Sequence, residues 1–113
     1  MTKALFKKKA EFAYNCVLEV KQAKEYKSIV KSFPVMVMTN GLIQALAYVK
    51  DKNKDFFNHL EKWLKEKSQF SLGDNDVIKK LIEEGEEEYR FHTDEILSLA
   101  NWFKRFVDSE IED

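Results

Sequence analysis

Apolar residues dominate the stretch 34–50, the most hydrophobic part of the chain. Their side chains point all around a helical turn, interrupted by three polar residues and by Gly41. A helix that is apolar on every side is normally buried by its neighbours, and Pro34 is well tolerated in a first helical turn. Because an interior glycine costs about 1 kcal/mol relative to alanine, we expect close packing at Gly41. The pattern predicts a buried central helix over about residues 34–50.

Before this stretch, helical periodicity runs without a break from about Thr2 to Lys31. One apolar face continues along the whole segment and predicts a single long helix packed on a core. The first half has a second apolar patch on another side. We expect another helix or another protein to cover this patch. Its interface candidates are Phe6, Ala10, Tyr14 and Val17.

Two shorter helices are predicted after the central one. Asn53 is placed to cap a helix that carries a regular apolar stripe over residues 56–64. Next, a polar break precedes a short helix over about residues 75–84, and Gly85 is expected to end it. Both helices show apolar spacing typical of one buried face.

The last helix is predicted to begin at Thr93, which serves as its cap, and to carry a core face as far as Val107. The preceding residues 86–92 are expected to form a short turn of helix or irregular chain. No segment alternates like a strand, so the fold class is all-α. We predict a compact bundle of about five to six helices around the central helix, as a single domain over residues 1–113.

Charge is distributed unevenly along the chain. Residues 1–68 contain 14 lysines and seven acids, a net charge of +7, whereas residues 69–113 contain five basic and 13 acidic residues, a net charge of −8. This asymmetry suits a polyanionic partner at one end or head-to-tail contact between copies, or the charges simply solvate helix faces.

The sequence indicates a cytoplasmic protein without a membrane segment. A single cysteine cannot form an internal disulfide, which fits a reducing compartment. Apolar runs are far shorter than a bilayer requires, and the N-terminus lacks the apolar core of a signal peptide.

Catalytic and metal-binding patterns are not found. His59 and His92 are far apart and lack the paired spacing of a zinc site. Residues 74–76 begin like a calcium loop but lack its later glycine and glutamate, so a helix cap is expected there. The acidic residues 83–88 read as a solvated surface, and Cys16 has no neighbouring base. We therefore expect no catalytic residue, no metal and no cofactor, and we do not expect an enzyme.

Basic residues offer the strongest functional signal. Lys21, Lys24, Lys27 and Lys31 share an arc of about 120° on the first predicted helix. Such an arc can follow a phosphate backbone without reading base sequence. The basic candidates for facing RNA are Lys21, Lys24, Lys27, Lys31, Lys104 and Arg105.

A series of short motifs occurs in order from about Tyr14 to Val107. The motifs are Tyr26-x-Ser28, Pro34, Gly41-Leu42-x-Gln44-Ala45-Leu46-Ala47, Trp63-Leu64, Tyr89-Arg90-x-x-Thr93-x-Glu95 and Trp102-x-Lys104-Arg105-Phe106. In this order and spacing, the chain resembles the small helical subunit of the Cmr-type (type III-B) CRISPR RNA-targeting effector complex, which serves antiviral defence. It departs from that pattern in its lysine-rich N-terminus and in the acidic run before Tyr89.

The resemblance implies a non-catalytic helical subunit of a ribonucleoprotein. Its implied partners are the other subunits of the Cmr-type complex, further copies of itself in a short stack, guide RNA and target RNA. The resemblance also implies that RNA cleavage belongs to a neighbouring backbone subunit. Three alternatives remain: a small subunit of another CRISPR effector type, a stand-alone helical adaptor that binds protein through the patch around Phe6 and Tyr14, and, least favoured, an enzyme.

Overall fold

The computed structural model describes residues 2–21 and 23–112, with side chains from residue 7 onward. Within these ranges the chain forms six α-helices and one π-helical turn and contains no strand. The elements are α1 (Thr2–Leu18), α2 (Ala23–Asn40), α3 (Leu42–Lys52), α4 (Lys54–Lys62), η1 (Trp63–Lys67), α5 (Val77–Glu83) and α6 (Glu86–Glu110). The predicted all-α bundle of about five to six helices is confirmed.

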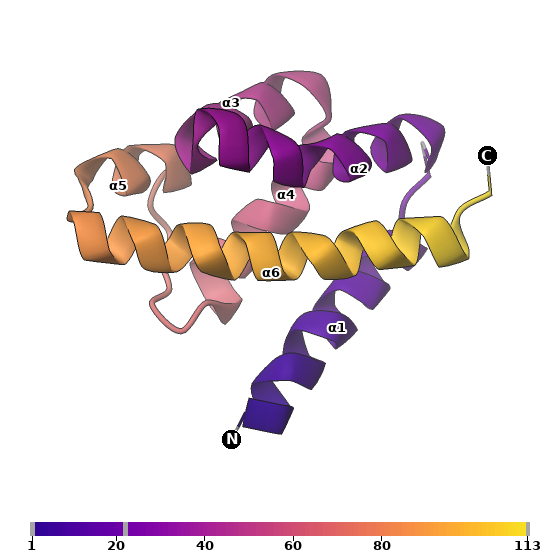
Figure 1. Ribbon diagram of the computed structural model, residues 1–113, viewed down its shortest axis with the longest axis horizontal. Coiled ribbons are helices and arrows are strands. Elements are labelled where there is room, and N and C mark those ends of the chain that lie inside the picture. The colour runs from indigo at the N-terminus through magenta and orange to yellow at the C-terminus, as the bar shows by residue number, and fades with distance from the viewer. Residues whose placement is uncertain (1, 22, 113) are drawn as a thin grey trace.

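Helix α6 organises the bundle (Figure 1). With 25 residues it is about 37 Å long, close to the longest dimension of the molecule, 40 Å. Both α1 and α2 pack against it, α3 packs against α2 and α4, and α5 packs against α3. Figure 1 shows α2 running along one side of α6 while α1 crosses on the other.

The start of α6 differs from the prediction. The helix begins at Glu86, directly after Gly85, so residues 86–92 belong to α6 instead of forming a separate helical turn or irregular chain. Three glutamates in the first turn are favourable there because they face the positive end of the helix dipole. Thr93 lies inside the helix, where its hydroxyl donates to the carbonyl of Tyr89 (2.8 Å), so it is not a cap. Gly85 does not end the preceding helix either, since α5 stops at Glu83.

The predicted central helix over residues 34–50 is interrupted at Gly41, which has φ 88° and ψ 159° and separates α2 from α3. Pro34 therefore lies inside α2 rather than in a first turn. The segment is also not buried on all sides, because Val35 is 66% and Met38 76% exposed. A β-carbon on Gly41 would lie 3.5 Å from the Tyr89 hydroxyl, an ordinary contact. The backbone conformation at Gly41, rather than close packing, therefore calls for glycine.

The predicted helix from Thr2 to Lys31 is divided as well. Helix α1 ends at Leu18, where the amides of Glu19 and Val20 donate to carbonyls three residues earlier at 3.2 Å and tighten the last turn. Helix α2 begins at Ala23. The periodicity continued through this break because the two helices each present an apolar face to α6.

Edge-to-face aromatic pairs occupy the centre of the core. The ring of Phe56 lies 5.4 Å from Tyr26, 5.3 Å from Phe33 and 5.4 Å from Phe103. These four residues come from α2, α4 and α6, so one cluster joins three helices. The predicted cap Asn53 is confirmed, since its side chain accepts the amide of Phe56 at 3.0 Å. No helix in the described ranges has the length and apolar character needed to cross a bilayer.

Candidate nucleic-acid interface

The four lysines of the predicted basic arc do not share one continuous helix. Lys21 lies before α2, whereas Lys24, Lys27 and Lys31 lie on it. Lys21 and Lys24 are exposed. In the described part of the chain, neither of these two side chains forms a hydrogen bond or ion pair. They are available to an anionic partner.

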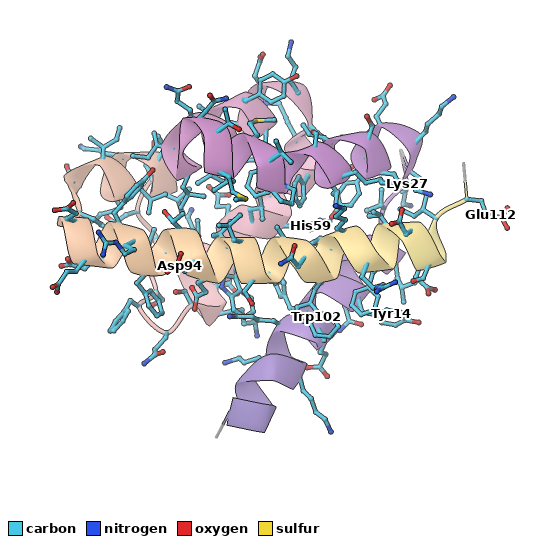
Figure 2. All side chains as sticks on the ribbon, in the orientation of Figure 1. Tyr14, Lys27, His59, Asp94, Trp102 and Glu112 are labelled. Carbon is cyan, nitrogen blue, oxygen red and sulfur yellow. The ribbon has the colours of Figure 1, made fainter. Side chains whose placement is uncertain are left out.

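Lys27 and Lys31 instead hold the end of α6. The half-buried Lys27 donates to the carbonyl of Ile111 at 2.9 Å, and Figure 2 shows it beside the C-terminal end of the chain. Lys31 pairs with Asp108 at 3.1 Å. This hydrogen-bonded contact holds the pKa of the Asp108 carboxyl below its usual range. Lys31 remains exposed, but Lys27 and Lys31 both have partners at the end of α6, unlike Lys21 and Lys24 among the described residues.

The two basic candidates on α6 lie on different faces. Lys104 is exposed and lies one turn before Asp108 on α6. With Lys31 and Lys27, it helps to lower the pKa of the Asp108 carboxyl. The structure therefore brings Lys104 near Lys31 and Lys27 of α2. Arg105 is also exposed but lines a shallow hollow of about 300 Å³ with Ser98, Asn101 and Trp102.

A second cationic group was missed in the sequence analysis. Lys8 and Lys9 on α1 lie across a groove from Lys62 of α4 and Lys67 of η1, and together they line two neighbouring cavities. The sequence contained a signal, the Lys7–Lys9 triplet, but periodicity alone could not show which distant lysines face it.

The predicted interface patch on α1 is only partly at the surface. Val17 is 2% exposed and belongs to the core, so the chain itself covers this part of the patch and Val17 is not available to another protein. Ala10 is half-buried, and the side chain of Phe6 lies outside the described residues. Tyr14 is 39% exposed, and its ring packs 5.3 Å from Phe106.

An aromatic row extends this patch across to α6. Trp102 stacks on Phe106 with ring centroids 5.7 Å apart, and Phe106 meets Tyr14 edge to face. Figure 2 shows Tyr14 and Trp102 near each other along one edge of α6. The row joins the two helices and presents a partly apolar surface to solvent.

The buried polar groups link elements together. His59 accepts a hydrogen bond from the Tyr26 hydroxyl at Nδ1 (2.7 Å), which leaves Nε2–H to donate to Glu19 (3.2 Å). Burial lowers the pKa of His59, so this contact is a hydrogen bond of the neutral ring rather than an ion pair. Burial also raises the pKa of the Tyr26 hydroxyl. The network fastens the α1–α2 connection to α4.

His92 and Cys16 have similarly structural surroundings. His92 is 1% exposed and contacts the carboxylate of Glu84 at 2.9 Å and the carbonyl of Phe70 at 2.9 Å. Burial raises the pKa of the Cys16 thiol to about 12, which disfavours the nucleophilic thiolate. Among the residues that the structure describes, no group of three or more His, Cys, Asp or Glu side chains is arranged to hold a metal ion.

Comparison with known proteins agrees with this architecture. The sequence model for "CRISPR-associated protein (Cas_Cmr5)" matches residues 5–110. A curated relative, the CRISPR system Cmr subunit Cmr5 of Thermus thermophilus, is 34% identical over 111 residues, covering 92% of this chain and 93% of the relative. The crystal structure of a CRISPR-associated Cmr5 family protein from Thermus thermophilus superimposes with a TM-score of 0.77 at 31% identity, covering 92% of this chain and 94% of that one.

These matches extend over nearly the whole chain and include both its sequence and its fold. They confirm the resemblance on which the sequence analysis relied. The chain belongs to the Cmr5 family of CRISPR-associated proteins.

Proposed function

We propose that this protein is a non-catalytic structural subunit of a Cmr-type CRISPR ribonucleoprotein. The observation that carries the proposal is the family match over residues 5–110. A relative named as a Cmr subunit supports it, because the alignment covers nearly the full length of both proteins. In this role the protein associates with other subunits of the complex and helps to position guide and target RNA.

Exposed lysines supply the RNA contact. Lys21 and Lys24 are exposed and unpaired among the described residues. Lys104 is also exposed, but it lies beside a later part of α2, near Asp108 and its partner Lys31. Lysine is a flexible point charge suited to phosphate, whereas base recognition favours more directional side chains. The surface therefore adds affinity without sequence preference.

The test is target-RNA binding by the reconstituted complex across a salt series. The variant combines Lys21→Glu with Lys24→Glu, and Lys79→Glu on α5 is the control because it changes an exposed lysine on another element. Each lost phosphate contact should reduce the slope of log affinity against log salt by about 0.7 to 0.9. We expect weaker binding and a shallower slope for the double variant alone, equally for every guide sequence.

Equal binding by the double variant and wild type would refute the role of these lysines. Failed assembly with a folded isolated variant would show that the two lysines contact another subunit. Lys27 and Lys31 are left unchanged in this test because they bond to the end of α6.

The non-catalytic part of the proposal is tested separately. The purified chain should cleave neither RNA nor DNA with Mg²⁺ or Mn²⁺. Cleavage that co-purifies with the protein and is lost on substituting Glu83–Glu88 would contradict the proposal.

Copies of the chain are proposed to contact each other head to tail, as the +7 and −8 segments suggest. A heterologous contact of this kind builds a short filament rather than a closed dimer. Sedimentation at low and high salt tests it, because contacts between exposed charges weaken as salt rises. Stronger association at high salt would instead favour an apolar contact.

An adaptor function is the second candidate, and the partly exposed aromatic row of Tyr14, Trp102 and Phe106 favours it. A protein partner held by this row should stay bound as salt rises, unlike RNA. Substituting Tyr14→Ser would weaken such a partner and leave RNA binding unchanged.

A further inference from the structure

We infer that the cavity between α1, η1 and α6 is a pocket for one unpaired nucleobase together with its phosphate. The inference deepens the proposed function and rests on it. The cavity has a volume of about 520 Å³, within the range of small-molecule sites. Its lining includes three lysines, three acids and two aromatic residues: Lys8, Lys9, Lys67, Glu66, Asp94, Glu95, Trp63 and Phe91.

An unsatisfied donor lies in the wall of this pocket. Trp63 is 2% exposed, and its Nε1–H has no hydrogen-bond partner in the described part of the chain. Buried polar groups almost always find a partner, and each exception calls for an explanation. The Nε1 atom itself is buried, so the indole has to turn toward the cavity for an acceptor on a bound base to reach this N–H. The residue opens the π-helical turn η1, an element found frequently at functional sites.

A carboxylate held in place by hydrogen bonds supplies an acceptor to complement the Trp63 N–H donor. Glu95 is 8% exposed and accepts the hydroxyl of Ser68 at 2.6 Å. The Ser68 hydroxyl in turn accepts the amide of Phe70 at 3.3 Å, which holds the pair in place. Asp94 lines the pocket beside it. Carboxylates of this kind accept from the exocyclic amino group of cytosine, and adenine presents a comparable amino group.

Aromatic and cationic side chains complete the match to a nucleotide. The half-buried ring of Phe91 lines the pocket and offers a surface against which a base can pack, as in recognition of single-stranded RNA. Lys8, Lys9 and Lys67 supply positive charge for the phosphate. A free phosphate would be repelled by the carboxylates and a simple cation by the lysines, whereas a nucleotide carries groups for both. A peptide segment without acidic side chains has no negative charge for the three ammonium groups, and an acidic peptide has no exocyclic amino group for the carboxylates, so we favour the nucleotide.

The experiment uses the full chain with Trp102→Phe, which leaves Trp63 as its sole tryptophan and fluorescent reporter. The probes are the four nucleoside monophosphates, ribose 5-phosphate and inorganic phosphate. We expect saturable quenching by AMP or CMP and none by the two probes without a base. In the same background, Asp94→Asn should weaken binding about tenfold, whereas Asp51→Asn, an exposed acid on α3, should have no effect.

Three results would overturn the inference: no saturable quenching by any nucleotide, equal quenching by ribose 5-phosphate, or equal quenching by a capped acidic peptide. The last would identify a protein partner instead. Melting curves of each variant confirm that the fold is retained. Failure here leaves the proposed function standing if Lys21 and Lys24 still govern RNA binding by the complex, so the two hypotheses are separable.

Discussion

Replacing Gly41 tests whether backbone conformation or packing sets the α2–α3 junction. Gly41 has φ 88° and ψ 159°, a region occupied almost only by glycine, where other residues cost about 1–3 kcal/mol. A β-carbon would meet the Tyr89 hydroxyl at 3.5 Å, so steric conflict adds little. We expect Gly41→Ala to lower the free energy of unfolding by about 2 kcal/mol. For a chain of this size that corresponds to a fall of about 8 °C in Tm.

Thermal and urea unfolding provide the measurement, with Gly85→Ala as a matched control. Gly85 has φ −69°, which alanine adopts easily, and its added β-carbon would meet only the movable carboxylate of Glu88. The control should stay within about 0.5 kcal/mol of wild type. A Gly41→Ala protein as stable as wild type would refute the reasoning. If Gly41→Leu is several kcal/mol worse than Gly41→Ala, packing rather than backbone strain limits the site.

Three further predictions follow from the polar contacts. Burial lowers the pKa of His59, so the unfolded chain binds a proton at this residue more readily than the folded chain does. The stability that the neutral ring contributes to the fold is therefore complete above about pH 6.5 and is lost as the pH falls below that value. Urea midpoints of the wild type should decline with falling pH, and the decline should be shallower in His59→Asn. Lys31→Glu should melt below Lys24→Glu because it places a second acid beside Asp108; equal melting temperatures would mean that the ion pair contributes nothing. Burial raises the pKa of the Cys16 thiol to about 12, so a disulfide reagent at pH 8 should react slowly with native protein and rapidly in urea, and fast native reaction would contradict this environment.

Sequence periodicity predicted the buried faces better than the helix ends. Phe56, Leu60, Trp63 and Leu64 are all buried, as the predicted stripe requires. Periodicity carries this information because one side of each helix must face the core. It cannot distinguish one helix from two that share a continuous pattern, which is why the break after Leu18 was missed.

Glycine and threonine positions were ambiguous for a related reason. An interior glycine that is tolerated and one that breaks a helix look the same in a sequence, and only φ 88° at Gly41 distinguishes them. Thr93 is equally suited to cap a helix or to bond back within one, as it does to Tyr89. The local pattern therefore favoured a later start for α6 than the structure has.

The candidate site was less predictable because it combines distant segments. Lys27 and Lys31 appeared equivalent to Lys24 along the helix, but the end of α6 provides partners for them. The pocket around Trp63 joins three elements, and no spacing in the sequence reveals an indole N–H without an acceptor.

The order of α1 and α6 along the chain affects how the protein can be made. Helix α1 leaves the ribosome before α6, yet Lys9, Phe12 and Tyr14 on it contact Ser98, Phe103 and Phe106 of α6, which is synthesised later. Contacts so distant in sequence form only after the chain has closed a long loop. Until the 25 residues of α6 emerge, α1 lacks its principal partner, and its apolar side chains are open to chaperones. A chain that ended before α6 would leave this apolar face of α1 uncovered.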